Sequence, residues 1–179
     1  MLASRGWWAN EDGAGWFLRE VWPAVSARRR DARLHFFGAR PSGELPAGVA
    51  SHPSPGDSGD AFFPGSLFVA ALRAASGVRM KILESWARGV PVVSTPEAAA
   101  GLESTEGVRI AANAEEFAAA VDELARDPAS VRRLVESGRR DLARFHDPAA
   151  VAERLSGIAA AAAGSRHVPA STADRRSPA

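Results

Sequence analysis

Two basic side chains and one acidic side chain lie close together in the stretch Ser76–Pro96. The pattern of this stretch predicts a tight turn, a helix, a short loop, a buried strand and a second turn. Arg79 and Lys81 fall in the first turns of the predicted helix, where the helix dipole favours acidic over basic residues. Basic side chains after a turn of small residues with free backbone N–H groups are typical of an anion site. We therefore predict an anion site at Arg79 and Lys81, with Glu84 one turn further on.

A second interpretation of the same residues needs no ligand. Lys81 is the only lysine in the chain, and Glu84 follows it by three residues. A Lys81–Glu84 pair on a solvated helix face would contribute only about 0.2–0.5 kcal/mol. The spacing alone leaves both interpretations open.

Residue spacing also predicts how this helix packs. Glycine at position 89 is expected to end the helix, and Pro91-Val92-Val93 starts the apolar strand. One side of the helix is apolar, and a separate stripe is mostly polar. The apolar side comprises Val78, Met80, Ile82, Leu83, Trp86 and Ala87, and the polar stripe comprises Gly77, Lys81, Glu84 and Arg88.

Composition excludes several classes of protein. The 179 residues suit one domain with a full-sized core, and a net charge of +1 gives no support for a nucleic-acid partner. With no cysteine, the chain has no disulfide, thiolate nucleophile or cysteine metal site. No apolar run reaches the length of a membrane span and no signal-peptide pattern is present, so we expect a cytoplasmic protein. P-loop, G-x-G-x-x-G, G-x-S-x-G and zinc-ligand patterns are absent, so we expect no cofactor and no metal site.

Strands and helices are expected to alternate along the chain. The predicted strands are Met1–Ala3, Leu34–Phe37, Val49–Ala50, Leu67–Ala71, Pro91–Ser94 and Val108–Ala111. Besides the helix after Ser76, the predicted helices are 15–29, 114–126 with Asn113 as cap, 127–145, and one from Pro148. Ser4–Gly15 and Ser51–Gly65 are expected to be loops, the latter with one helical turn at Asp60–Phe63.

This alternation predicts an α/β fold, a Rossmann-like three-layer domain with a parallel sheet flanked by helices. In such sheets ligands bind beyond the carboxyl ends of the strands. Ser76-Gly77 and Thr95-Pro96 each follow a strand, so both turns are expected at that edge. We expect the domain to span residues 1–158, and residues 159–179, rich in Ala, Ser, Arg and Pro, to be a disordered tail.

The stretch from Gly77 to Pro96 resembles the donor-binding signature of GT-B glycosyltransferases, and it is most similar to glycosyltransferase family 4. Flanking segments agree with this resemblance, which covers about residues 1–146. They are Trp8-Ala-Asn10-Glu-Asp-Gly13, Trp16-Phe17-Leu18, Val21-Trp22-Pro23, Ala98-Ala-Ala-Gly101-Leu102 and Glu116-Phe117-Ala118. The resemblance implies one half of a GT-B fold, the carboxy-terminal half that binds the nucleotide-diphosphate sugar.

The resemblance also implies a role for each matching residue. Glu84 would accept hydrogen bonds from the ribose hydroxyls, and the backbone N–H groups of Gly77 and Val78 would bind the diphosphate. Arg79 and Lys81 would stabilise the departing nucleoside diphosphate without a metal, which makes them the catalytic candidates in a retaining hexosyl transferase. Thr95 would hydrogen-bond near the phosphates or the sugar.

Two departures from the family pattern accompany these matches. Many members carry a second Glu eight positions before the ribose-binding one, where this chain has Ser76, which the resemblance still places in the donor site. The Arg-x4-Lys arrangement that many members use to grip the diphosphate is also absent from the loop after the first strand. Base specificity would come from loops such as Ser51–Asp57.

A GT-B enzyme also needs an amino-terminal domain that supplies the acceptor site. We expect this partner domain in cis or in trans, the first strand of the present domain to be truncated, and the isolated chain to be inactive. Two alternatives stay open: a GT-B-like nucleotide-sugar epimerase fragment and a non-catalytic Rossmann-like binding module. Thermal shift with UDP, GDP, ADP and dTDP separates a nucleotide-binding domain from the binding module.

The other candidate residues are assigned to structural roles. His35 is expected in the core or at a sheet end, and His52 in a surface loop, rather than as catalytic bases. The arginines grouped at 28–30 and at 132–140 are interpreted as solvated helix faces, and membrane contact has no further support.

Overall fold

Every described strand runs parallel to the strands with which it pairs. The computed structural model describes residues 2–3, 8–38, 43–74, 77 and 79–164. One sheet has the order β1-β2-β3, with bounds Leu2–Ala3, Leu34–Gly38 and Val49–His52. The other has the order β4-β5-β6, with bounds Phe68–Ala70, Val92–Ser94 and Val108–Ile110. The predicted α/β fold with parallel strands and flanking helices is confirmed, although the expected single sheet is divided into two.

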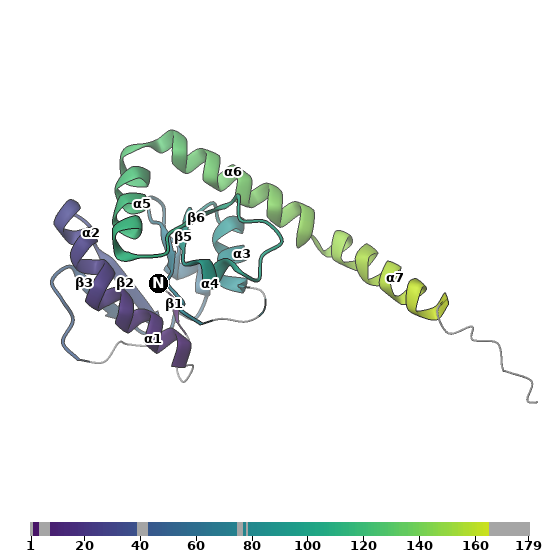
Figure 1. Ribbon diagram of the computed structural model, residues 1–179, viewed down its shortest axis with the longest axis horizontal. Coiled ribbons are helices and arrows are strands. Elements are labelled where there is room, and N and C mark those ends of the chain that lie inside the picture. Colours follow the sequence, from purple (N-terminus) through teal and green to yellow (C-terminus); the bar gives the residue numbers. More distant parts are fainter. Residues whose placement is uncertain (1, 4–7, 39–42, 75–76, 78, 165–179) are drawn as a thin grey trace, which may run out of the picture. The chain divides into compact units, whose positions relative to one another are not determined.

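Helices connect these strands (Figure 1). Contacts divide the chain into two units, residues 1–143 and 144–179, and both sheets belong to the first. The helical segments before β4 are α1 (Trp8–Trp16), the π-helical η1 (Phe17–Val21), α2 (Trp22–Arg28) and the 3-10 turn η2 (Ser58–Ala61). Those after β4 are α3 (Met80–Ala87), α4 (Pro96–Ala99), α5 (Ala114–Arg126), α6 (Pro128–Phe145) and α7 (Pro148–Gly164).

Both faces of the β4-β5-β6 sheet are buried. Phe68 packs in one apolar cluster with Trp86 of α3, whereas its neighbour Val69 packs in another with residues of α1, η1, α2 and α5. Successive side chains of a strand point to opposite faces, so helices cover this sheet from both sides. The second cluster also contains Phe36 of β2, which joins the two sheets through one core. This is the layered arrangement of a Rossmann-like domain.

The first helix begins earlier than the sequence pattern predicts. Ser4–Gly15 was expected to be a loop because of its glycines, but residues from Trp8 onward form α1. Gly13 has a packing role within this helix: a Cβ there would lie 2.2 Å from the carbonyl oxygen of Ala71. The glycine therefore allows α1 to approach the chain that leaves β4, at a modest cost in helix propensity.

Several smaller predictions are confirmed or corrected. Asn113 caps α5, accepting a hydrogen bond of 3.0 Å from the Glu116 N–H, and Gly89 ends α3 with φ of +70°. Met80 was expected to face inward but is 69% exposed, because it is the first residue of α3 and the inward side of that turn is occupied by Ile82 and Leu83. The predicted turn after β5 contains α4, and the predicted turn at Asp60–Phe63 lies at η2 instead.

The expected tail also differs in part. Helix α7 continues through the first residues of the segment 159–179, as far as Gly164. Alanine is the strongest helix former, and this part of the chain is rich in it. Among the described helices, none combines the length and the apolar character that crossing a membrane requires.

Candidate functional site at the carboxyl ends of the strands

Helix α3 carries most of the predicted site residues, and Trp86 fixes its position. The Trp86 side chain is 1% exposed, and its indole N–H donates to the Gly107 carbonyl oxygen at 2.9 Å. A Cβ added to Gly138 of α6 would lie 2.4 Å from the Trp86 ring, so α6 and this indole are in close contact. Burial and one directional hydrogen bond therefore hold α3 in place between the sheet and α6.

Two basic residues stand at the beginning of this helix, as predicted. Arg79 occupies the N-cap position, and its carbonyl accepts from the Ile82 N–H at 2.8 Å. Burial lowers the pKa of Lys81, as does the positive charge of Arg79, whereas Glu84 acts in the opposite direction. The three side chains are therefore near enough to influence one another electrostatically. A partly buried ammonium beside a guanidinium favours an anion at this place.

Glu84 lies on the polar side of α3, but its ion-pair partner is not the one that the spacing suggested. Arg88 places a guanidinium nitrogen 3.3 Å from the Glu84 Oε1 atom, and the Ser58 hydroxyl donates to the same oxygen. Within the described residues, both of these contacts go to Oε1. A carboxylate has two acceptor oxygens, so Oε2 can serve a ligand hydroxyl. The geometry suits the predicted ribose contact without requiring the loss of either protein contact.

The loop after β3 is held beside Glu84. Asp57 accepts from the Gly59 N–H at 2.7 Å, which fixes the turn η2, and Arg88 reaches the same carboxylate oxygen at 3.4 Å. The Arg88 guanidinium also lies 5.8 Å from the Phe62 ring centre. The segment in which we expected base recognition, Ser51–Asp57, therefore ends next to the predicted ribose contact.

Thr95 follows β5 and makes structural contacts. Its side chain is almost fully buried, and its hydroxyl donates to the Leu72 carbonyl oxygen and accepts from the Ala98 N–H at 3.2 Å. A hydroxyl has one donor and two acceptor positions, so one acceptor position remains. Thr95 thus caps α4 and joins the ends of β4 and β5, and it has little capacity left for a ligand.

A polar cavity of about 340 Å³ opens at this same edge. Three of its residues follow strands: Arg73 comes after β4, Thr95 after β5 and Ala112 after β6. The other lining residues are Trp16, Glu20 and Glu97. The cavity therefore lies where parallel sheets usually bind ligands.

Sequence reasoning missed Arg73. This arginine is half-exposed in the cavity, 3.7 Å from the Asp12 carboxylate of α1. A signal was available, because Arg73 lies just beyond the predicted strand Leu67–Ala71, on the edge where ligands were expected. Glu20 and Glu97 carried no comparable signal. Glu20 accepts from the Trp16 indole at 3.0 Å, and both residues lie within the helix predicted at 15–29.

Two of the predicted donor-binding positions, Ser76 and Val78, lie outside the described residues. Gly77 has φ of +71°, and a Cβ there would meet open space. The turn thus has the left-handed backbone that favours glycine, with room beside it. The roles of these residues toward a donor stay predictions.

The histidines form a separate pair on the first sheet. His35 Nδ1 and His52 Nε2 are 2.9 Å apart across β2 and β3, with the His52 ring stacked on Phe37. Burial lowers the pKa of His35, and the neighbouring His52 lowers it further. Across the residues that the structure describes, no cluster of three or more His, Cys, Asp or Glu residues has the arrangement of a metal site.

Comparison with known proteins identifies a family. The family model described as glycosyl transferases group 1 matches residues 1–127. This range contains both sheets, α3 and the polar cavity. A search of curated proteins finds no match.

Proposed function

We propose that this chain, which belongs to the glycosyl transferases group 1 family, binds the nucleotide-diphosphate sugar of a sugar-transfer reaction at the carboxyl edge of its strands. The GT-B glycosyltransferase domain is supported by the family match. The location of the donor is supported by one observation above all: Arg79, Lys81 and Glu84 are brought together at the start of a helix inside the matched range.

Each group of the donor has a matching partner. The diphosphate would lie at the start of α3, where Arg79 and Lys81 supply positive charge and the Gly77 turn gives the backbone room to approach. Glu84 Oε2 would accept from the ribose hydroxyls. The sugar would extend into the polar cavity lined by Arg73 and Glu97, whose side chains can hydrogen-bond to hydroxyl groups.

In the reaction, the bond between the sugar C1 and the diphosphate oxygen breaks, C1 bonds to the acceptor's nucleophilic atom, which loses its proton, and negative charge grows on the leaving diphosphate. Arg79 and Lys81 would stabilise this charge in place of a metal ion, and partial burial of Lys81 strengthens the interaction. Retention of configuration at C1 rests on the family resemblance alone. We further propose that the domain works as the carboxy-terminal half of its enzyme and that a partner domain, in cis or in trans, supplies the acceptor site.

A thermal-shift series with UDP, GDP, ADP and dTDP tests donor binding. Ligand at about 100 times its dissociation constant should stabilise the chain by roughly 2.7 kcal/mol, and EDTA should leave this shift unchanged. Glu84→Ala should reduce the shift, whereas Glu136→Ala, on the exposed face of α6, should not. Absence of any shift with all four nucleotides would contradict donor binding. Sugar transfer to an acceptor by the isolated chain would contradict the need for a partner domain.

A further inference from the structure

The guanidinium of Arg88 lies directly against the turn η2. Arg88 occupies the C-cap position of α3, where the helix dipole favours a cation. A Cβ added to Gly59 of η2 would lie 2.6 to 2.9 Å from three atoms of this guanidinium. The side chain of Arg88 therefore rests on the backbone of the turn, and a glycine at position 59 leaves the room for it.

One nitrogen of this guanidinium contacts two carboxylates. Arg88 Nη2 lies 3.3 Å from Glu84 Oε1 and 3.4 Å from Asp57 Oδ1. Two carboxylates repel each other, and a cation that contacts both replaces this repulsion with attraction. Asp57 also caps η2, where it accepts from the Gly59 N–H. Arg88 therefore joins Glu84 of α3 to the residue that fixes the turn.

The turn in its place supplies a second contact to Glu84. Ser58, the first residue of η2, donates its hydroxyl to Glu84 Oε1, the same atom that Arg88 contacts. Hydrogen bonds are directional, so two donors on one oxygen restrict the rotation of the carboxylate. Both donors depend on η2, because Arg88 rests on Gly59 and Ser58 belongs to the turn.

The contacts of Arg88 are too exposed to matter much for the stability of the fold. Its side chain is 39% exposed, and those of its partners Glu84 and Asp57 are 27% and 75% exposed. Ion pairs of this kind stabilise a folded chain only weakly. The buried Trp86 already anchors α3. The main consequence of the Arg88 contacts is therefore the orientation that they give to Glu84.

We propose that Arg88 is a positioning residue for nucleotide binding and that it acts through Glu84. This inference rests on the proposed function, in which Glu84 accepts from the ribose hydroxyls. Arg88 joins η2 to α3, and Arg88 and Ser58 together hold Oε1 so that Oε2 is left for the ribose. A carboxylate that is already oriented loses less side-chain freedom when the ligand binds, and the affinity is higher for that reason. Arg88 itself makes no contact with the nucleotide.

A double-mutant cycle on the full chain tests this route. The probe is whichever of UDP, GDP, ADP and dTDP binds most tightly, and isothermal titration calorimetry gives its Kd. Arg88→Ala should weaken binding about 3- to 10-fold. Adding Arg88→Ala to Glu84→Ala should change the Kd by less than about 2-fold, because the residue through which Arg88 acts is then missing. Arg126→Ala, which removes an ion pair of the same i,i+4 spacing from α5, should leave the Kd unchanged.

Two glycine variants test the same contact without a change of charge. Gly59→Ala should displace the guanidinium, which is the far end of a flexible side chain, and weaken binding about as much as Arg88→Ala. Gly56→Ala, in the same loop but with open space beside it, should bind like the original chain. Urea unfolding should show that both variants fold.

The outcomes separate this inference from the proposed function. If the original chain binds none of the four nucleotides, the proposed function is wrong and the inference fails with it. If the original chain binds but Arg88→Ala binds equally well, only the inference is wrong. Equal losses from Arg88→Ala in the two backgrounds would show that it does not act through Glu84, and equal binding by Gly59→Ala and Gly56→Ala would show that contact with the turn has no role. Either result would overturn the inference.

Discussion

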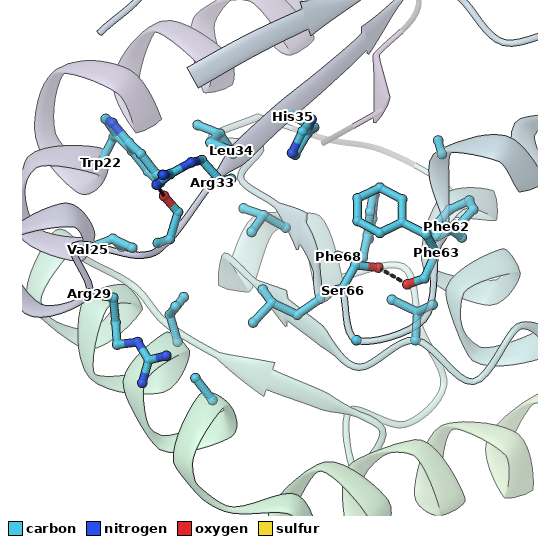
Figure 2. A pocket seen from close by; sticks show the side chains of 18 of the residues that line it. Trp22, Val25, Arg29, Arg33, Leu34, His35, Phe62, Phe63, Ser66 and Phe68 are labelled. Carbon is cyan, nitrogen blue, oxygen red and sulfur yellow. Dashed lines mark hydrogen bonds between the residues drawn. The ribbon is translucent and has the colours of Figure 1, made fainter. Parts of the chain in front are cut away.

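Two cavities lie at opposite ends of the strands and are similar in volume, about 340 and about 270 Å³, but their linings differ. The first has Arg73, Glu20 and Glu97 around it, whereas the second is lined mainly by aromatic and aliphatic side chains. This contrast follows from the connections. At the polar end Arg73 follows β4 and Glu97 follows β5, whereas at the apolar end Phe62 and Phe63 precede β4 (Figure 2) and Val90 precedes β5. The two cavities are therefore similar in volume, but one has a charged lining and the other a mainly apolar lining.

The largest expected effect concerns the polar end. Glu84→Ala should weaken nucleotide diphosphate binding about 10- to 100-fold, because a hydrogen bond to a charged group contributes roughly 1.5–3 kcal/mol. Isothermal titration calorimetry measures this change, and Glu84→Gln should recover part of the affinity. If the affinity of Glu84→Ala were unchanged, the ribose would not bind at Glu84.

A substitution between the two ends tests how α3 is positioned. Gly138→Ala adds a methyl group 2.4 Å from the Trp86 ring, and overpacking of this kind costs about 1–3 kcal/mol. Urea unfolding should show the loss, and nucleotide affinity should fall with it, since Trp86 anchors the helix that carries Lys81 and Glu84. Gly157→Ala in α7, where a Cβ meets open space, is the matched control. If the free energy of unfolding of Gly138→Ala equalled that of the original chain, α6 would be able to move away from Trp86 without a loss of stability.

A smaller effect is expected from the cavity wall. Arg73→Ala should weaken binding of a nucleotide sugar about 3- to 10-fold, as expected for one partly exposed charge–ligand contact. Binding of the corresponding nucleotide diphosphate should change less, since the sugar is the part placed in the cavity. Arg126→Ala on the exposed surface of α5 controls for net charge. Equal losses for the two ligands would place Arg73 at the diphosphate instead.

The smallest effect concerns pH and is confined to the first sheet. Because burial and His52 lower the folded-state pKa of His35, the unfolded chain binds the proton more readily. The contribution of His35 to stability is therefore complete above a pH of about 6.5 and declines as pH falls from there towards the folded pKa. Urea unfolding of the original chain and of His35→Phe at several pH values measures this contribution of His35 to stability. If the stability of His35→Phe depended on pH in the same way as that of the original chain, the histidine pair would not be the source of the pH dependence.

The fold could be predicted from strongly periodic segments. Apolar spacing correctly predicted the helices α3 and α5, and runs of consecutive apolar residues correctly predicted the buried strands β4 and β5. Helix α1 was missed because Gly13 and Gly15 resemble turn residues, and the reason for Gly13 is a contact with Ala71, far away in the sequence. The exposure of Met80 was missed for a related reason, since where the helix begins depends on the turn before it.

The candidate site could be predicted only where its residues are adjacent in sequence. Lys81 and Glu84 were found by helix spacing and by the family signature. The contact of Glu84 with Ser58 and the position of Arg73 depend on which loops the sheets bring together, and single-sequence patterns carry no such distances. The apolar cavity left no sequence signal, since its lining residues resemble any other core.

One titration tests the central claim most directly. The ¹⁵N-labelled chain is titrated with whichever of UDP, GDP, ADP and dTDP gives the largest thermal shift, and amide chemical-shift changes are mapped by residue. Donor binding at the carboxyl edge predicts the largest changes at Gly77, Lys81 and Glu84, with Arg73 next and little change at Leu34 or Phe68, which line the apolar cavity. Changes concentrated at Leu34 and Phe68, or no saturable change anywhere, would contradict it.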